Sequence, residues 1–170
     1  LSTSPILVFS ADGSSVDTLH TVSTSGGFTT DSLTGSNRGL STDADGNILY
    51  VQSGPSKIIK INYQTMEEMA SHVITEVGSS PTRAASSSDG TIFVGPVVGG
   101  GTSAIVKYDT DLNYLENAVD GPPSIARTLE VSQDGNTIFW TPFTPQQGVF
   151  MYTRADEFSP YALTDSALIG

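Results

Sequence analysis

Three of the chain's four arginines recur at matching positions, and their type and spacing suit the binding of anions. Arg38, Arg83 and Arg127 stand eight, seven and eight residues before the glycine of an Asp-Gly pair. A guanidinium stays charged and presents a planar fork of donors that fits carboxylate and phosphate groups. Each arginine either pairs with an acidic or carbonyl neighbour in the adjacent structural unit, or contributes with the others to an anion site. Arg38, Arg83 and Arg127 are therefore the candidate ligand-binding residues.

The other reactive side chains form no pattern that performs catalysis or holds a metal ion. Asp43 and Asp45 suggest a calcium loop, but the required Gly at the sixth position and Glu at the twelfth are missing when counted from Asp43. His20 and His72 lie 52 residues apart, without zinc-ligand spacing. The chain has no Cys and no GxSxG nucleophile motif, and the glycine cluster at 99–101 has no following Lys. We expect no catalytic residue, no metal and no cofactor.

Charge and composition limit the partners and the compartment. Seven basic and eighteen acidic residues give a net charge of −11, which repels nucleic acid and anionic membrane surfaces. No apolar run approaches the length of a membrane span. The chain begins with Leu1 and shows no signal peptide, so we expect that a leader was removed or that the segment was excised. The lack of Cys, the few Lys and the many Ser, Thr and Gly residues suit an exported protein, either extracellular or periplasmic.

One phrase occurs three times and predicts the elements that carry the arginines. The copies are RGLSTDADGNILYV (38–51), RAASSSDGTIFV (83–94) and RTLEVSQDGNTIFW (127–140), and their Asp-Gly glycines lie 44 and 45 residues apart. Each copy combines a strand of small and apolar residues, an Asp-Gly hairpin turn and an aromatic or β-branched strand. A period of about 45 residues with several short strands per unit is typical of four-stranded propeller blades.

Two more strands complete each predicted unit. A loop and a third strand follow every phrase, at 57–63, 104–110 and 149–155. Weaker polar segments such as 112–120 and 158–165 can supply the solvated outer strand. Residues 66–74 could instead form a short helix, because Met66, Met69 and Ala70 have helical spacing.

The predicted fold is all-β, and the whole chain forms one segment of a propeller. Residues 6–23 match a third and a fourth strand, and the Gly-, Ser- and Thr-rich residues 24–37 match a link. The expected units are a half blade with its link and three blades, at 1–36, 37–80, 81–124 and 125–170.

The repeated phrase, followed by KI-x-K-type third strands, resembles the β-propeller superfamily with NHL, YVTN and gluconolactonase-like repeats. The resemblance covers almost the whole chain and implies that the phrase forms the two inner strands of a blade. Gluconolactonase-like members hold a metal with acidic and amide side chains from several blades. Those ligands do not map onto residues of this chain, and an architecture by itself does not assign an activity.

An arc of three and a half blades leaves its two end faces open. We therefore expect further blades of the same protein, another protein chain or self-association to cover them. The favoured hypothesis is a noncatalytic exported propeller segment that acts as a binding or assembly module within a larger propeller. Two alternatives stay open: part of a metal-dependent lactonase or lyase of propeller type, and a structural subunit of an extracellular fibre.

Overall fold

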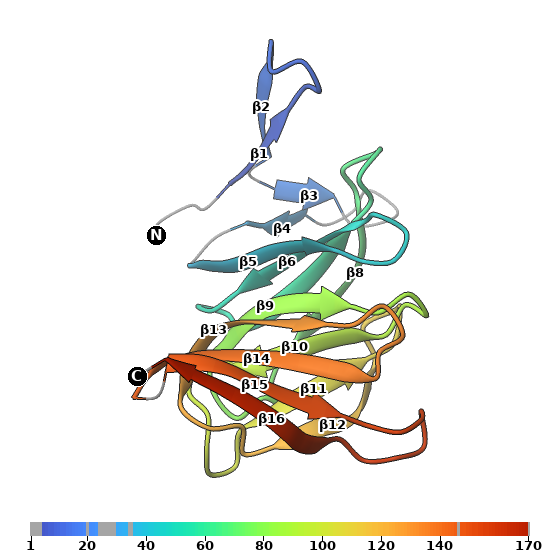
Figure 1. Cartoon of the computed structure of the whole chain (residues 1–170). Coiled ribbons are helices and arrows are strands. Elements are labelled where there is room, and N and C mark those ends of the chain that lie inside the picture. Colours follow the sequence, from blue (N-terminus) through green and yellow to red (C-terminus); the bar gives the residue numbers. More distant parts are fainter. Residues whose placement is uncertain (1–4, 20, 24–29, 34–35, 146, 170) are drawn as a thin grey trace.

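Three four-stranded antiparallel sheets form the body of the protein (Figure 1). The computed structural model describes residues 5–19, 21–23, 30–33, 36–145 and 147–169. Within these ranges every regular element is a strand, and no helix that could cross a membrane is present. The predicted all-β fold, a partial propeller of four-stranded blades, is confirmed.

Each sheet, called a blade from here on, pairs its strands in chain order. The first blade consists of β5 (Asn37–Thr42), β6 (Ile48–Gln52), β7 (Lys57–Ile61) and β8 (Glu68–Val73). The second consists of β9 (Pro81–Ser86), β10 (Ile92–Pro96), β11 (Ala104–Tyr108) and β12 (Tyr114–Asp120). The third consists of β13 (Ile125–Val131), β14 (Thr137–Thr144), β15 (Gln147–Thr153) and β16 (Ala162–Ile169).

The blades stack face to face, and this explains their apolar middle strands. The first strands of the blades, β5, β9 and β13, lie next to one another and form the inner edge (Figure 1). In the second blade, β10 and β11 are buried at every position, because a neighbouring blade covers each face. Strands covered on both sides are expected to be continuously apolar instead of alternating.

Two hydrophobic clusters join the three blades. The cluster between the first and second blades includes Leu49, Val51 and Ile58 from one side and Ile92, Val94, Val106 and Tyr108 from the other. The cluster between the second and third includes Phe93 and Ile105 from one side and Leu129, Ile138, Trp140, Phe150 and Tyr152 from the other. Successive residues of one strand therefore serve opposite interfaces, as strand geometry requires.

The N-terminal part forms two small hairpins. β1 (Ile6–Phe9) pairs with β2 (Val16–Leu19), and β3 (Thr21–Ser23) pairs with β4 (Thr30–Ser32). Ile6 and Leu33 are buried against Tyr50, Ile59 and Ile61. The N-terminal part therefore covers the face of the first blade that points away from the second blade. β4 lies inside the stretch that the sequence predicted to be only a link.

The structure decides two local details. Residues 68–73 form the strand β8, and the helix offered as an alternative for 66–74 does not form, because pairing with β7 satisfies the backbone and a nine-residue helix would be marginal on its own. The outer strand of the third blade is Ala162–Ile169, displaced toward the C-terminus from the predicted 158–165. The preceding residues instead form a turn in which Asp156 accepts hydrogen bonds from Phe158 and Ser159.

The Asp-Gly turns have the backbone that the repeat predicted. Gly46, Gly90 and Gly135 have φ angles of +86°, +88° and +68°, a region that costs other residues conformational energy. The asparagine or threonine that follows the glycine lies directly before the second strand. In two of the turns the aspartate accepts a hydrogen bond from a serine hydroxyl two residues earlier, Ser87 to Asp89 and Ser132 to Asp134, both at 2.6 Å.

Replacing Gly90 with valine is expected to destabilise the protein by more than about 1 kcal/mol, the ordinary cost of a left-handed position. A Cβ at residue 90 would lie 2.5 Å from the Cγ2 atom of Thr110, so steric overlap adds to the backbone cost. Gly46→Val is the matched control, because a Cβ there meets nothing within 4 Å. Urea denaturation should show a larger loss for Gly90→Val. Equal losses for the two variants would contradict the packing at Thr110.

Candidate functional site

The three predicted arginines occupy one repeated feature of the inner strands. Arg38 lies at the register shift of β5 between Asn37 and Gly39, and Arg127 lies at the corresponding shift of β13. Arg83 lies at the shift of β9. Such bulges re-aim a side chain away from the regular alternation of the strand. The structure thus places the three arginines at equivalent places on three adjacent strands.

The arginines have different partners despite their equivalent positions. Arg83 forms an ion pair through Nη1 with Oε1 of Glu130, which lies on the inner strand of the next blade. The Arg127 guanidinium stands 5.1 Å from the centre of the Phe143 ring in its own blade. The Nε atoms of Arg38 and Arg83 are buried without a hydrogen-bond partner. Arg83 therefore acts as a staple between blades, and anion binding by the three arginines stays a prediction.

A buried ion pair that the sequence analysis missed holds the first blade to the second. Nζ of Lys60 lies 2.8 Å from Oδ2 of Asp43, and these side chains are 6% and 3% exposed. The same ammonium donates a hydrogen bond to the Thr110 carbonyl in the second blade at 3.0 Å. Burial would raise the pKa of Asp43, but hydrogen bonds from Lys60 and Asn47 outweigh it and hold the pKa below its usual value. Asp43 therefore has a structural role within the first blade.

Of the two histidines, only His72 lies within the described residues, and it contacts a carboxylate. Nε2 of His72 lies 3.0 Å from Oε1 of Glu76, and the Tyr108 hydroxyl donates to the other oxygen of that carboxylate at 3.0 Å. His20 lies outside the described residues. Across residues 5–19, 21–23, 30–33, 36–145 and 147–169, no three His, Cys, Asp or Glu side chains group as metal ligands would.

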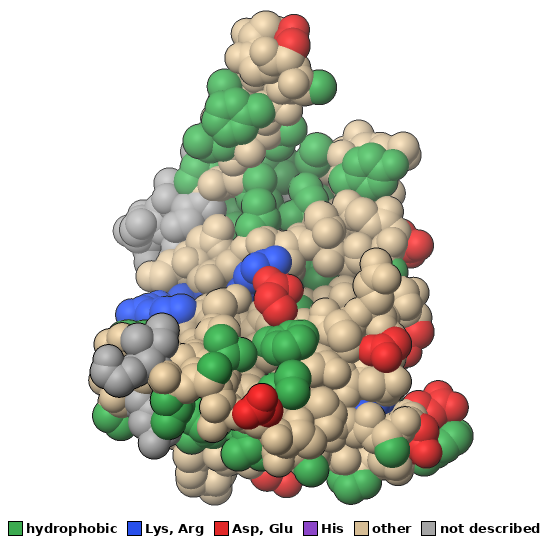
Figure 2. All heavy atoms as spheres, in the orientation of Figure 1, with side chains coloured by type: hydrophobic (Ala, Val, Ile, Leu, Met, Phe, Trp, Pro, Cys, Tyr) green, Lys and Arg blue, Asp and Glu red, His purple; other side chains and the backbone are tan. Residues whose placement is uncertain are grey.

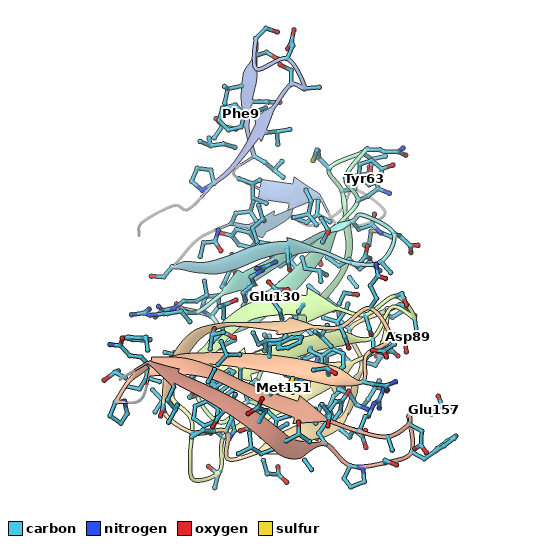
Figure 3. All side chains as sticks on the ribbon, viewed as in Figure 1. Phe9, Tyr63, Asp89, Glu130, Met151 and Glu157 are labelled. Atoms are coloured by element: carbon cyan, nitrogen blue, oxygen red, sulfur yellow. The ribbon has the colours of Figure 1, made fainter. Side chains whose placement is uncertain are left out.

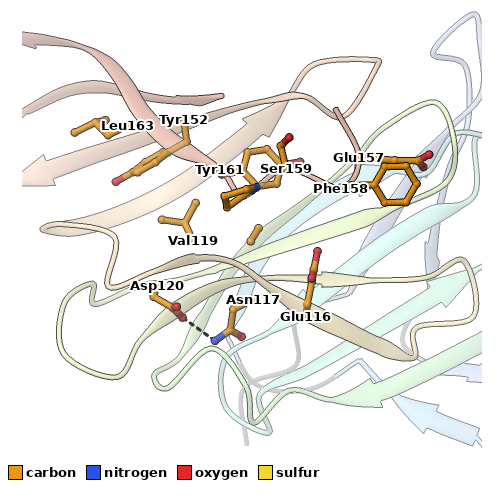
Figure 4. A pocket seen from close by; sticks show the side chains of 12 residues that line it. Glu116, Asn117, Val119, Asp120, Tyr152, Glu157, Phe158, Ser159, Tyr161 and Leu163 are labelled. Carbon is orange, nitrogen blue, oxygen red and sulfur yellow. Dashed lines mark hydrogen bonds between the residues drawn. The ribbon is translucent and has the colours of Figure 1, made fainter. Parts of the chain in front are cut away.

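A groove of about 740 Å³ lies on the outer rim between the second and third blades (Figure 4). One wall is β12, and the other is the segment that joins β15 to β16. The groove presents both carboxylates and aromatic rings, from Glu116, Asp120, Glu157, Tyr152, Phe158 and Tyr161. No catalytic motif in the sequence pointed to this place, because the loop before β16 forms half of it.

Several polar groups of this groove are engaged within the protein. Glu116 forms an ion pair with Lys107, and Asp120 accepts a hydrogen bond from the Asn117 side chain at 2.8 Å. The Tyr161 hydroxyl donates to the Gly135 carbonyl, and the Arg154 guanidinium lies 4.9 Å from the centre of the Tyr161 ring. Burial raises the pKa of Tyr161 to about 12. The groove can accommodate a ligand, but these residues offer no nucleophile paired with a base.

One face of the third blade is uncovered, whereas the corresponding faces of the first and second blades are covered. Cross-strand pairing makes Phe139 and Met151 equivalent to Phe93 and Lys107, and Val149 is equivalent to Ile105. Phe93 and Ile105 are fully buried, whereas Val149 is 36% exposed and Phe139 and Met151 are only half-buried. We call Phe139, Val149 and Met151 the open face. Hydrophobic side chains are visible on this side of the molecule in Figure 2, and Figure 3 labels Met151 there.

Hollows between side chains mark the same face. One of about 140 Å³ is bordered by the three open-face residues and by β16, and another of about 360 Å³ continues along Pro142, Phe143 and Gly148. The apolar lining therefore runs along β14 and β15 and reaches Ala167 of β16. Contiguous apolar patches of several hundred Å² usually mark interaction sites.

Comparison with solved structures identifies the fold. A virginiamycin B lyase from Staphylococcus aureus matches 94% of this chain and 54% of its own, with a TM-score of 0.60 and 14% identity. Hydrazine synthase from Kuenenia stuttgartiensis matches 96% of this chain and 48% of its own, with a TM-score of 0.64 and 17% identity. A protein assigned as a 6-phosphogluconolactonase from Bacteroides uniformis matches 99% of this chain and 52% of its own, with a TM-score of 0.64 and 13% identity.

These matches establish a β-propeller fold and no activity. The chain spans about half the length of each of the three similar structures. No protein-family model matches the chain, and no curated protein matches it significantly.

Proposed function

We propose that this chain is a noncatalytic, exported segment of a larger β-propeller that acts as a binding or assembly module through its open face. The observation that carries the proposal is the contrast between repeat-equivalent positions, since Ile58 and Ile105 are fully buried and Val149 is not. A position that stays apolar in every blade is expected to be covered in every blade. Half the length of the similar structures also leaves room for the missing neighbours.

Covering this face would stabilise an assembly. Each 100 Å² of apolar surface that a partner buries contributes about 2.5 kcal/mol at about 25 cal/mol per Å², and the net stability of a domain is only about 5–15 kcal/mol. Enzymes are among the similar structures, so the alternative function is part of a metal-dependent propeller enzyme of lactonase or lyase type.

The double variant Val149→Thr/Met151→Lys tests the proposal. A lysine already occupies the Met151 position in the first and second blades, as Lys60 and Lys107, so the strand tolerates it. We expect weaker binding of the hydrophobic dye ANS and less association, with the unfolding free energy changed by less than about 0.5 kcal/mol. Sedimentation, dye fluorescence and urea denaturation provide the three measurements.

A matched control changes the same repeat position in a covered blade. Ile105→Thr removes apolar contacts from a fully buried site and should cost about 2 kcal/mol or more. Equal losses of stability for the Ile105 and Val149 variants would mean that residue 149 is already covered. A monomer of 17.8 kDa that binds no dye would likewise oppose the proposal.

A further inference from the structure

The opposite end of the arc carries a second uncovered apolar surface. Leu7 and Phe9 of β1 are 53% and 62% exposed, and they alternate with Ile6 and Val8, which pack toward the first blade. Figures 1 and 3 show this hairpin projecting from the body with Phe9 on it. The strand β1 is therefore apolar on both sides. The first blade covers only one of these sides, which leaves Leu7 and Phe9 exposed.

β1 matches the third strand of a blade, residue by residue. The turn after it closes with a hydrogen bond from the Ser10 amide to the Ser15 carbonyl, as the turn after β11 closes from Asp109 to Asn113. This alignment makes Leu7 and Phe9 equivalent to Val106 and Tyr108 of the second blade. It also makes them equivalent to Phe150 and Tyr152 of the third.

The two uncovered surfaces are the two halves of one repeated interface. Between the second and third blades, Ile105 on one side shares a buried cluster with Phe150 and Tyr152 on the other. On the open face, Val149 and Met151 occupy the positions that Ile105 and Lys107 occupy in the second blade. On the N-terminal hairpin, Leu7 and Phe9 occupy the positions that Phe150 and Tyr152 occupy in the third blade.

We propose that a second copy of this chain covers the open face, with its Leu7 and Phe9 placed against Val149 and Met151. This inference rests on the proposed function and names its partner. The contact is heterologous, so two copies arranged head to tail bury both ends of each chain and close into a pair. Two copies also supply the length of the similar propellers, each of which this chain covers about half.

Charge works against the contact and makes it sensitive to salt. Each copy carries a net charge of −11, so the two repel one another at low ionic strength. Screening shortens the range of this repulsion from about 30 Å at 0.01 M salt to about 3 Å at 1 M. The apparent dissociation constant should therefore fall as sodium chloride is raised.

A complementation experiment with one variant at each end tests the head-to-tail arrangement. Phe9→Asp and Met151→Asp each place a charge in both contacts of a closed pair, so each variant alone should sediment as a monomer. An equimolar mixture of the two retains one intact contact, between Met151 of one chain and Phe9 of the other. The mixture should therefore form a heterodimer, while the unmodified chain forms a dimer of twice 17.8 kDa.

The control is Met69→Asp, which changes a methionine that is 47% exposed on the outer strand β8 of the first blade. It should sediment as the unmodified dimer does, whereas each end variant should weaken dimerisation by at least about thirtyfold, the effect of a strong interface residue. Tagging each variant with a different fluorophore allows the heterodimer to be distinguished from residual homodimers.

Other outcomes would overturn the second copy as the partner, and they show whether the proposed function fails with it. A mixture that stays monomeric excludes head-to-tail contact, and a mass that grows without limit excludes the closed pair. If the unmodified chain is a monomer whose dye binding is lost in Val149→Thr/Met151→Lys, a second copy is excluded while the open face stays a binding face. A monomer that binds no dye overturns both.

Discussion

Replacing Lys60 with methionine is expected to destabilise the protein by about 3–5 kcal/mol, the usual cost of leaving one member of a buried ion pair alone. The carboxylate of Asp43 would stay buried without its cation, because its side chain is only 3% exposed. The contact from Lys60 to the Thr110 carbonyl, which ties the first blade to the second, would also be lost. Urea denaturation at neutral pH measures the effect.

The third blade supplies the control for this variant. It has Ser132 where the first blade has Asp43, and Met151 where the first blade has Lys60. The double variant Asp43→Ser/Lys60→Met copies that arrangement and removes both charges. It should recover most of the loss, since well-packed uncharged residues can replace a buried ion pair at little net cost. A double variant no more stable than Lys60→Met would show that the ion pair is not the cause.

The stability of the unmodified chain and that of Lys60→Met should depend differently on pH in the range where carboxyl groups titrate. In the unmodified chain the pKa of Asp43 is held below its usual value of 3.8, so its contribution to stability is present above that value and is lost as pH falls. Without Lys60, only the hydrogen bonds from Asn47 oppose the effect of burial, so the pKa of Asp43 should be higher than in the unmodified chain. Protonation would then relieve the buried charge, so the deficit of Lys60→Met should shrink as the pH is lowered.

Replacing Trp140 with alanine is expected to cost about 3–5 kcal/mol, which is a large share of the stability of a domain. Trp140 is fully buried between the second and third blades, and its Nε1 donates to the Pro123 carbonyl at 2.9 Å. A Cβ on Gly95 would lie 2.6 Å from the Trp140 ring, so the glycine provides the space that the ring fills. The cavity left by alanine could not collapse without moving the backbone of a neighbouring blade.

Phe143→Ala is the control for this prediction, because Phe143 lies on the same strand and is 40% exposed. It should cost less than about 1 kcal/mol. Trp140 is the only tryptophan, so circular dichroism should follow unfolding instead of tryptophan fluorescence. Similar losses for the two variants would contradict the view that Trp140 holds the two blades together.

The repeated phrase predicted the fold well because its information is local. An Asp-Gly pair specifies a hairpin turn, and Gly90 at +88° shows that the turn needs the backbone freedom of glycine. A period of 44 and 45 residues then requires one sheet for each unit. The same reasoning was weaker at the third outer strand and at residues 24–37, where polar residues without alternation carry no strong strand signal.

The side-chain contacts of the candidate site residues were harder to predict, because the residues that pair with one another are distant in the chain. The sequence identified Arg83 as half of a pair but could not choose Glu130, since that choice depends on the bulge in β9 and on the stacking of the next blade. The pairing of Asp43 with Lys60 was not predicted, because it depends on the register of β6 and β7. The rim groove was not foreseen, because a loop closes it.

By itself, the sequence determined that this protein builds stacked antiparallel sheets from a repeated unit, because turn chemistry and strand composition act within a few neighbouring residues. Only the tertiary structure decided which of the apolar strand residues are covered. Val149 and Ile105 have the same local sequence character, and they differ in exposure because the third blade packs on Ile105 whereas no described blade packs on Val149. Burial is a property of neighbours in space, so the open face and the proposed contact of Met151 with Phe9 of a second copy emerged only once the blades were placed.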